Sequence, residues 1–352
     1  GGIKPHFING DEISSFDQIE KLLWFEEQPF NPPHNALFWN MYEEMQKNQI
    51  KVVLTGLDGD SVISYGQNYL KELAITFQWN KLFKEIREES KLRSKYSQHT
   101  QKSESVFLRL YDNKSFLMLL WGKVMVPLIP ENLKKLFRRL KLNRHQQYNR
   151  VKPDTFILNT DFLIKSNVEK YLEDLYIKPK QQANSPKKFH YFLINNPPHQ
   201  KIFEIWDIRA AAFSIEARHP FFDKRVVEFC YGMPTNMKYR FGWNRFILRM
   251  AMENILPSSI RWRLLKQDLN PVFQKNLLFY EKKRIEEVFD NKKFIEEFVD
   301  MEKLQIIYKN YQSQGKGTGL ADSIGGIFDA QDIWLVVLLQ TWFKEKLKWK
   351  YK

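Results

Sequence analysis

A short apolar run that leads directly into a turn of glycines and carboxylates restricts the fold of this chain more than any other feature. The run is Val52-Val53-Leu54, and the turn that follows reads Thr-Gly-Leu-Asp-Gly-Asp and ends at Asp60. β-Branched residues favour a strand, and glycines allow the chain to turn at once. In open α/β sheets ligands bind beyond the carboxyl ends of such strands, where glycines admit a phosphate and aspartates reach a cation. Turns of this composition often only reverse the chain, so the turn alone leaves both interpretations open.

The apolar spacing on either side of this run predicts helices. Before it, helical spacing covers residues 17–25 and 35–47, and a short strand is expected to end at residues 7–8. After it, residues 68–77 and 81–96 have the spacing of helices. A strand between helices is typical of a parallel sheet with helical crossovers, so we expect an α/β fold.

The composition is that of a folded protein from a reducing compartment. With 352 residues and 43% hydrophobic content, the chain can bury a large core. Its single cysteine, Cys230, excludes an internal disulfide, and no signal peptide is visible, so we expect a cytoplasmic location. An excess of 55 basic over 41 acidic residues gives a net charge of +14. This charge favours an anionic partner without choosing among nucleotides, peptides, nucleic acids and membranes.

The middle of the chain is predicted to be helical and basic. Residues 115–130 form the most apolar window, but it is short and contains Lys123, so we expect a buried helix and no transmembrane segment. Residues 131–144 combine an apolar face with a face of lysines and arginines. A solvated helix of the domain is the first interpretation, an acidic-peptide site the second, and a membrane or nucleic acid comes after these. Residues 181–188, with Pro186, are expected to form a surface loop.

The carboxyl-terminal half has the pattern of helices separated by prolines. Helices are predicted over residues 200–214, 225–231, 243–254 and 331–346, and Asp223 is placed to cap the second of them. Strand patterns nearly vanish from the middle of the chain onward. The α/β fold is therefore expected to be predominantly helical.

Three segments, taken in order, resemble the synthetase domain of the asparagine synthetase superfamily. Residues 54–60 are similar to the strand and Ser/Thr-Gly-x-Gly-Ser/Gly-Asp motif of that family. Residues 214–223, Ser-Ile-Glu-Ala-Arg-His-Pro-Phe-Phe-Asp, resemble its Glu-x-Arg-x-Pro-Phe-Leu-Asp signature. Leu248-Arg249, Leu256-Pro257 and residues 261–266 resemble its Leu-Arg, Leu-Pro and arginine-rich segment, which ends in an essential lysine. The resemblance spans nearly the whole chain.

The resemblance implies an adenine-nucleotide α-hydrolase-like fold of the PP-loop ATP pyrophosphatase type, in which helices surround a parallel sheet. Within one synthetase domain, we expect residues 1–110 as the nucleotide-side α/β part, 111–190 as a helical insertion and 191–352 as a helical part with the lysine loop. The family's Ser-Gly-Gly-x-Asp-Ser pyrophosphate loop has no copy before Thr55. We therefore expect the given chain to be incomplete at its amino terminus, or to be a degenerate relative.

The family's chemistry is activation of a carboxylate by ATP to an acyl-adenylate, with loss of pyrophosphate, followed by attack of an amine. By this resemblance Thr55 and Gly56 contact the nucleotide, and Asp60 binds Mg²⁺, which neutralises charge on the phosphates. Lys266 is the expected catalytic cation, which stabilises the departing pyrophosphate and the tetrahedral oxyanion. Asp58 is a candidate catalytic base, or it supports the residues that touch the substrate.

Three residues of these motifs also have structural interpretations. Glu216 and Arg218 contact the substrate in one interpretation, and in the other they form an ion pair that fixes the turn after them. Lys266 follows two arginines, and it is otherwise part of a solvated basic turn. Both interpretations stay open for each residue.

Two further patterns suggest binding sites but have a better structural explanation. His219 and Asp223 resemble a metal-binding pair, yet no third ligand accompanies them, so we prefer capping and packing. Residues 315–319, Gly-Lys-Gly-Thr-Gly, resemble a phosphate loop, but no strand precedes them. We expect a flexible loop there.

Within the superfamily the chain most resembles the lasso-peptide macrolactam cyclases. Their first motif often reads Gly-x-Asp-Gly-Asp, and their lysine segment reads Trp-Arg-x-x-Lys-x-Asp-Leu, as residues 262–269 do here. Asparagine synthetases tend to have glutamate at the positions of Leu57 and Ser61. The expected partners are a precursor peptide as substrate and a leader-peptide protease, with no nucleic acid. A glutamine-hydrolysing asparagine synthetase is the first alternative, and a non-catalytic peptide-binding relative is the second.

Overall fold

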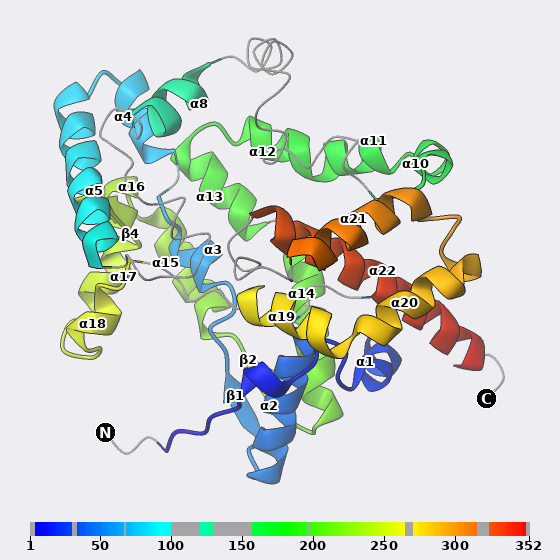
Figure 1. Cartoon of the computed structure of the whole chain (residues 1–352). Coiled ribbons are helices and arrows are strands. Elements are labelled where there is room, and N and C mark those ends of the chain that lie inside the picture. The colour runs from blue at the N-terminus through cyan, green and yellow to red at the C-terminus, as the bar shows by residue number, and fades with distance from the viewer. Residues whose placement is uncertain are drawn as a thin grey trace.

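The computed structural model describes residues 4–29, 34–66, 68–99, 120–129, 157–195, 198–264, 270–314 and 324–349. Within these residues helices dominate, and they accompany one parallel sheet of two strands (Figure 1). An antiparallel pair, β3 (Tyr239–Arg240) and β4 (Trp243–Asn244), forms a separate hairpin. The expected predominance of helices is confirmed, but the described parallel sheet is smaller than the family resemblance implies.

The two parallel strands bring distant parts of the chain together. β1 (Val52–Leu54) lies beside β2 (Glu216–Arg218), so the strand predicted before the glycine turn is confirmed. Val53 packs against the main core, whereas Val52 and Leu54 lie on the opposite face and are 40% and 68% exposed. One face of a parallel sheet, which is ordinarily covered, is therefore open in the part of the chain that the structure describes.

The main hydrophobic core is built by helices from both ends of the chain. The contributing helices are α1 (Ile19–Glu26), α2 (Asn35–Lys47), α14 (Pro198–Ala212), α19 (Asn270–Tyr280), α20 (Lys282–Asp290), α21 (Met301–Gln314) and α22 (Ile324–Trp349). The helices predicted at residues 17–25, 35–47 and 200–214 are confirmed to within two residues at each end.

The last helix is central to this core and longer than predicted. It extends beyond the expected residues 331–346 at both ends. Ala330, Trp334 and Leu338 are completely buried, and Val336 and Val337 nearly so. A helix that is apolar around most of its circumference belongs inside a core, and α1, α19, α20 and α21 all pack against α22 (Figure 1).

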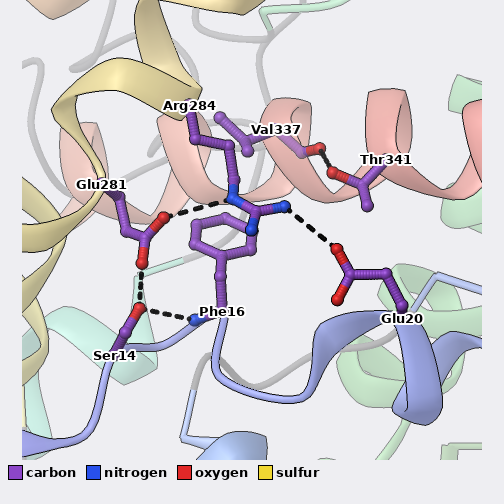
Figure 2. Close-up of polar contacts among 7 residues, drawn as sticks. All are labelled: Ser14, Phe16, Glu20, Glu281, Arg284, Val337 and Thr341. Carbon is purple, nitrogen blue, oxygen red and sulfur yellow. Dashed lines mark hydrogen bonds and ion pairs between the residues drawn. The ribbon is translucent and has the colours of Figure 1, made fainter.

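A polar network ties the amino-terminal segment to α20. Arg284 pairs with Glu281 at 3.2 Å and with Glu20 at 3.5 Å, and its guanidinium lies 5.5 Å from the centre of the Phe16 ring (Figure 2). The Ser14 hydroxyl donates a hydrogen bond to Glu281. The network therefore fixes the start of the chain on the surface of the main core.

Two expectations for short segments are wrong. The strand expected to end at residues 7–8 is not found: residues 4–9 have no regular structure, and they are exposed or half-buried without a partner strand among the described residues. The loop expected at residues 181–188 ends early, since α13 (Pro186–Ile194) begins within it. Its proline occupies the first helical position, where no backbone N–H is needed, and the Ser185 hydroxyl accepts a hydrogen bond from the first turn.

The hairpin of β3 and β4 replaces the start of a longer predicted helix, which begins only at α17 (Phe246–Ala251). Gly242 turns the chain with φ +75°, a conformation that favours glycine. Its N–H donates to the Glu85 carboxylate at 3.0 Å, and an added Cβ would lie 2.5 Å from the Glu89 backbone. Both acidic residues belong to α5 (Trp79–His99), so a distant helix determines this turn.

Some expectations concern residues outside the described ranges. The basic helix at 131–144 and the glycine-rich loop at 315–319 lie there entirely. Of the apolar window at 115–130, residues 120–129 are described, and most are helical. Val124 is buried but Trp121 and Met125 are exposed, so the expected burial holds only in part there. Across the described ranges, we find no helix with the length and apolarity that a membrane crossing requires. The division of the chain into three parts stays a prediction.

Candidate functional site

The two strands end side by side, and the first two motifs meet there. The Thr55 N–H donates to the carbonyl of the last β2 residue at 2.9 Å, so the pairing continues past β1. Asp58 has a left-handed backbone (φ 58°) and precedes α3 (Gly59–Ile63). An added Cβ at Gly59 would lie 3.1 Å from the Phe221 ring, so the glycine lets α3 approach the second motif closely.

A hydrogen bond between Thr55 and His219 connects the strand ends directly. Thr55 Oγ1 and His219 Nδ1 are 2.6 Å apart, and the Leu57 N–H donates to Thr55 Oγ1 at 3.3 Å. Burial lowers the pKa of His219, while the charges of Asp58 and Asp207 act in the opposite direction. Because the net effect is downward from an ordinary value of 6.5, His219 is neutral at neutral pH.

Asp58, predicted as a base or a supporting residue, is held by His199. His199 Nε2 and the Ser61 hydroxyl lie 3.1 Å and 3.3 Å from Asp58 Oδ1. His199 Nδ1 lies 3.1 Å from the Ile194 carbonyl, so both ring nitrogens face acceptors and the imidazolium is favoured. The hydrogen bond to Asp58 raises the pKa of His199 accordingly. The Asp58 side chain is only 10% exposed, which suits a supporting role better than contact with a substrate.

Asp60, the predicted Mg²⁺ ligand, forms an ion pair with Arg245 at 2.9 Å. Arg245 also donates to the Tyr65 hydroxyl at 2.6 Å and lies 4.4 Å from the centre of that ring. Mg²⁺ is commonly held by one or two carboxylates together with phosphates and water. The half-buried Asp60 carboxylate would fit this mode as a single protein ligand if Mg²⁺ took the place of Arg245. Within the described residues, no group of three or more His, Cys, Asp or Glu residues is arranged to hold a metal.

Glu216 and Arg218 form an ion pair with each other, which is one of the two roles that the sequence left open for them. Nε and Nη2 of Arg218 donate to the two carboxylate oxygens of Glu216 at 2.8 Å and 3.1 Å. Both side chains are more than half exposed, because they project from β2 on the open face of the sheet. An ion pair this exposed contributes little to stability. Because both side chains are exposed, both are accessible to a ligand on that face.

Lys266, the predicted catalytic lysine, lies outside the described residues, but the segment before it is anchored. Arg249 donates to the carbonyls of Arg261 at 2.6 Å and Asn244 at 3.0 Å, and lies 4.7 Å from the Trp243 ring centre. Burial lowers the pKa of Arg249 to about 10, which leaves it charged at neutral pH. The Leu-Arg motif thus fixes the start of the lysine segment.

A second histidine supports α3 from its far end. His190 Nε2 lies 2.9 Å from the Val62 carbonyl, and its Nδ1 lies 3.0 Å from Lys238 Nζ. Burial lowers the pKa of His190 to about 4 and that of Lys238 to about 8. His190 is therefore neutral, donating to Val62 and accepting from Lys238. Two histidines therefore hold α3 between them: His199, whose pKa is raised by Asp58, and the neutral His190.

A cavity of about 570 Å³ lies at the carboxyl ends of the two strands. Its mainly apolar lining comprises Leu54, Phe203, Arg218, His219, Pro220, Phe222 and Asp223. Asp223 caps α15 (Lys224–Gly232) by accepting from the Arg225 N–H at 2.9 Å, which confirms the predicted cap. Gly56, predicted to contact the nucleotide, borders open space, since nothing described lies within 4 Å of an added Cβ.

A turn of glycines and carboxylates beside a cavity, beyond the carboxyl ends of parallel strands, defines a strand-end ligand site of the α/β class. The sequence model of the family described as asparagine synthase matches residues 3–344. The chain therefore belongs to the asparagine synthase family, whose domain has the PP-loop ATP pyrophosphatase fold. The resemblance of the three motifs to this superfamily is thereby confirmed.

Similarity to an individual characterised protein is limited to a short segment. Fifty residues are 44% identical to glutamine-hydrolyzing asparagine synthetase 3 of Bacillus subtilis (strain 168). The match covers 14% of this chain and 8% of that protein. No solved structure matches the chain. The likeness to lasso-peptide cyclases stays a prediction.

The sequence motifs did not include the partners of the site carboxylates. His199 and Arg245 stand outside the quoted motifs, and neither has a local pattern that marks it. Nothing in the sequence gives a reason to select His199 from the other histidines, because it lies 141 positions after Asp58. Only the packing of α14 against the strand end brings the two side chains together.

Proposed function

We propose that the protein is an ATP-dependent, AMP-forming amide synthetase, a ligase that adenylates a carboxylate and joins it to an amine. Family membership over residues 3–344, with its first two motifs assembled into one strand-end site, carries this proposal. Thr55 and Gly56 are assigned to the nucleotide, Asp60 to Mg²⁺ and Lys266 to stabilising negative charge. Bound Mg²⁺ and ATP supply the leaving group that a carboxylate lacks.

We further propose that the substrate is a lasso-type precursor peptide, whose amino terminus is joined to an Asp or Glu side chain in a macrolactam. Leu57 takes the place of the glutamate that asparagine synthetases tend to have, which supports a different acceptor. The apolar wall formed by Leu54, Phe203 and Phe222 offers few partners to free aspartate, with its ammonium and two carboxylates. A peptide covers such a wall with its own apolar groups. A cytoplasmic location and a leader-peptide protease as partner belong to this proposal.

The test is ATP–pyrophosphate exchange by the protein produced from its complete gene. The acids compared are free L-aspartate and linear peptides with a free amino terminus and one Asp or Glu. We expect exchange that depends on a peptide, and loss of one water from that peptide by mass spectrometry.

Exchange that requires free aspartate and ignores every peptide would establish the asparagine synthetase alternative, which the Bacillus subtilis match supports. Absence of exchange with any acid, together with unchanged peptide binding after Lys266→Ala, would establish the non-catalytic peptide-binding alternative.

A further inference from the structure

His219 lines the cavity, and within the described ranges only one of its two ring nitrogens is hydrogen-bonded. Nδ1 lies 2.6 Å from Thr55 Oγ1, and Nε2 has no hydrogen-bond partner among the described residues. The Thr55 hydroxyl is itself positioned by the Leu57 N–H. An imidazole oriented through one nitrogen, with the other free, is the arrangement of a general acid or base.

Aromatic side chains hold this imidazole and limit its contact with water. The Phe203 ring meets His219 edge-on at 5.0 Å, and the Phe222 ring lies 4.7 Å from Phe203. The resulting burial lowers the pKa of His219, so the ring is neutral at neutral pH and able to accept a proton.

Carboxylates near the ring favour the imidazolium once a proton has been accepted. Asp58 and Asp207 both act to raise the pKa of His219. Asp58 itself is held in place by His199 and Ser61. On the cavity wall itself, Arg218 and Asp223 carry opposite charges. These surroundings therefore suit an imidazole that is neutral before the reaction and carries a positive charge for a short time after it accepts a proton.

Asp58 is the competing candidate for a base, and the structure favours the histidine. The Asp58 side chain is 10% exposed and bound to His199, and it does not belong to the cavity lining. His219 does line the cavity and is only partly buried. A general base must lie within hydrogen-bond reach of the reacting group, and of Asp58 and His219 it is His219 that borders the cavity.

We propose that His219 is the general base of amide formation at this site, a role that rests on the proposed function. This role requires the tautomer in which Nδ1–H donates to Thr55 Oγ1 and Nε2 carries no proton. A neutral amine attacks the acyl carbon, the C–N bond forms, and the bond from that carbon to the phosphate oxygen breaks. The electron pair of the broken bond leaves with AMP. The attacking nitrogen, now positively charged, gives one proton to Nε2.

The test compares His219→Asn with the unaltered protein from its complete gene. Asparagine places its amide nitrogen near the position of Nδ1, so the bond to Thr55 is retained while no atom replaces Nε2. The readouts are ATP–pyrophosphate exchange, macrolactam formation by a linear peptide with one Asp or Glu, and trapping of the activated carboxyl by hydroxylamine. Hydroxylamine is a strong, unprotonated nucleophile at neutral pH, so it depends less on a base.

We expect His219→Asn to slow macrolactam formation by about 10²- to 10⁴-fold, while exchange and hydroxylamine trapping are preserved. The unaltered protein should lose macrolactam activity as acid protonates His219, and the variant should lack this pH dependence. His6→Asn, at an exposed histidine near Glu44, is the matched control and should leave all three activities unchanged.

Three outcomes would overturn the role of His219, and they differ from one another. Macrolactam formation at the unaltered rate in His219→Asn refutes the base alone. Parallel loss of exchange, trapping and macrolactam formation shows that His219 serves activation or folding. Absence of exchange with any peptide or with aspartate in the unaltered protein refutes the proposed function, and the base with it.

Discussion

Arg209 and Glu26 form an ion pair inside the main core, and replacing the arginine alone should destabilise the protein more than replacing both residues. Arg209 Nε lies 2.6 Å from Glu26 Oε1, and the two side chains are 3% and 0% exposed. Arg209 also donates to Asn35 at 2.9 Å. Burial raises the pKa of Glu26, with Arg209 acting against it. The second carboxylate oxygen has no hydrogen-bond partner among the residues that the structure describes.

Removing the guanidinium leaves this carboxylate buried without a compensating charge. We expect Arg209→Met to lower the free energy of unfolding by about 3–5 kcal/mol. The double variant Arg209→Met/Glu26→Leu should recover most of that loss, because well-packed apolar groups often replace a buried ion pair without penalty. Part of the loss in the single variant should also disappear at acid pH, since a protonated Glu26 carries no charge.

Urea unfolding followed by tryptophan fluorescence and circular dichroism measures these differences. Arg284→Met is the matched control, because the ion pairs of Arg284 are partly exposed and should contribute about 1 kcal/mol or less. A loss below about 1 kcal/mol in Arg209→Met, or a double variant as unstable as the single one, would refute the reasoning.

The remaining predictions concern the hairpin, the strand-end turn and the lysine segment. Gly242→Ala should lower the free energy of unfolding by more than about 1 kcal/mol, because a new Cβ would lie 2.5 Å from the Glu89 backbone. Urea unfolding measures this loss, and an unchanged free energy would contradict the prediction. The pKa of His199 is raised, so its stabilising charge is fully present below pH 6.5 and is lost as pH rises through the folded-state pKa. The temperature of unfolding should therefore fall over that window, and His199→Gln should remove this fall; an identical pH profile in the variant contradicts the assignment. Lys266→Ala should reduce amide formation by about 10²-fold or more without changing the unfolding temperature. Full activity in that variant would exclude a catalytic lysine.

The elements that could be predicted from the sequence are those that neighbouring residues determine. The helical spacing before the glycine turn, the apolar run of β1 and the capping by Asp223 are all local patterns, and each is present in the structure. The hairpin at Gly242 escaped prediction because its turn depends on Glu85 and Glu89, which belong to a different helix. Pro186 was misinterpreted as part of a loop, although proline is favoured at the first position of a helix.

The candidate site divides in the same way. The motifs placed Thr55 and the second motif at one site, and the structure joins them through the Thr55–His219 hydrogen bond. The motifs did not indicate that His199 binds Asp58 or that Arg245 pairs with Asp60, because isolated polar residues have no periodicity and acquire their role only from a neighbour in space. The tie between Lys238 and His190 is of the same kind.

The pairing of β1 with β2 also sets the order in which the site is assembled. Thr55 and His219 are 164 positions apart in the sequence. Their contact therefore closes a long loop, and this closure costs conformational entropy. Contacts within single helices and between adjacent helices form sooner than contacts of such sequence separation. During synthesis the cavity cannot form until His219 has emerged from the ribosome, because His219 is part of its lining. The site therefore depends on a long-range contact, and a change that separates β1 from β2 should disturb Thr55 and His219 together with the part of the main core that Val53 and Ala217 contact.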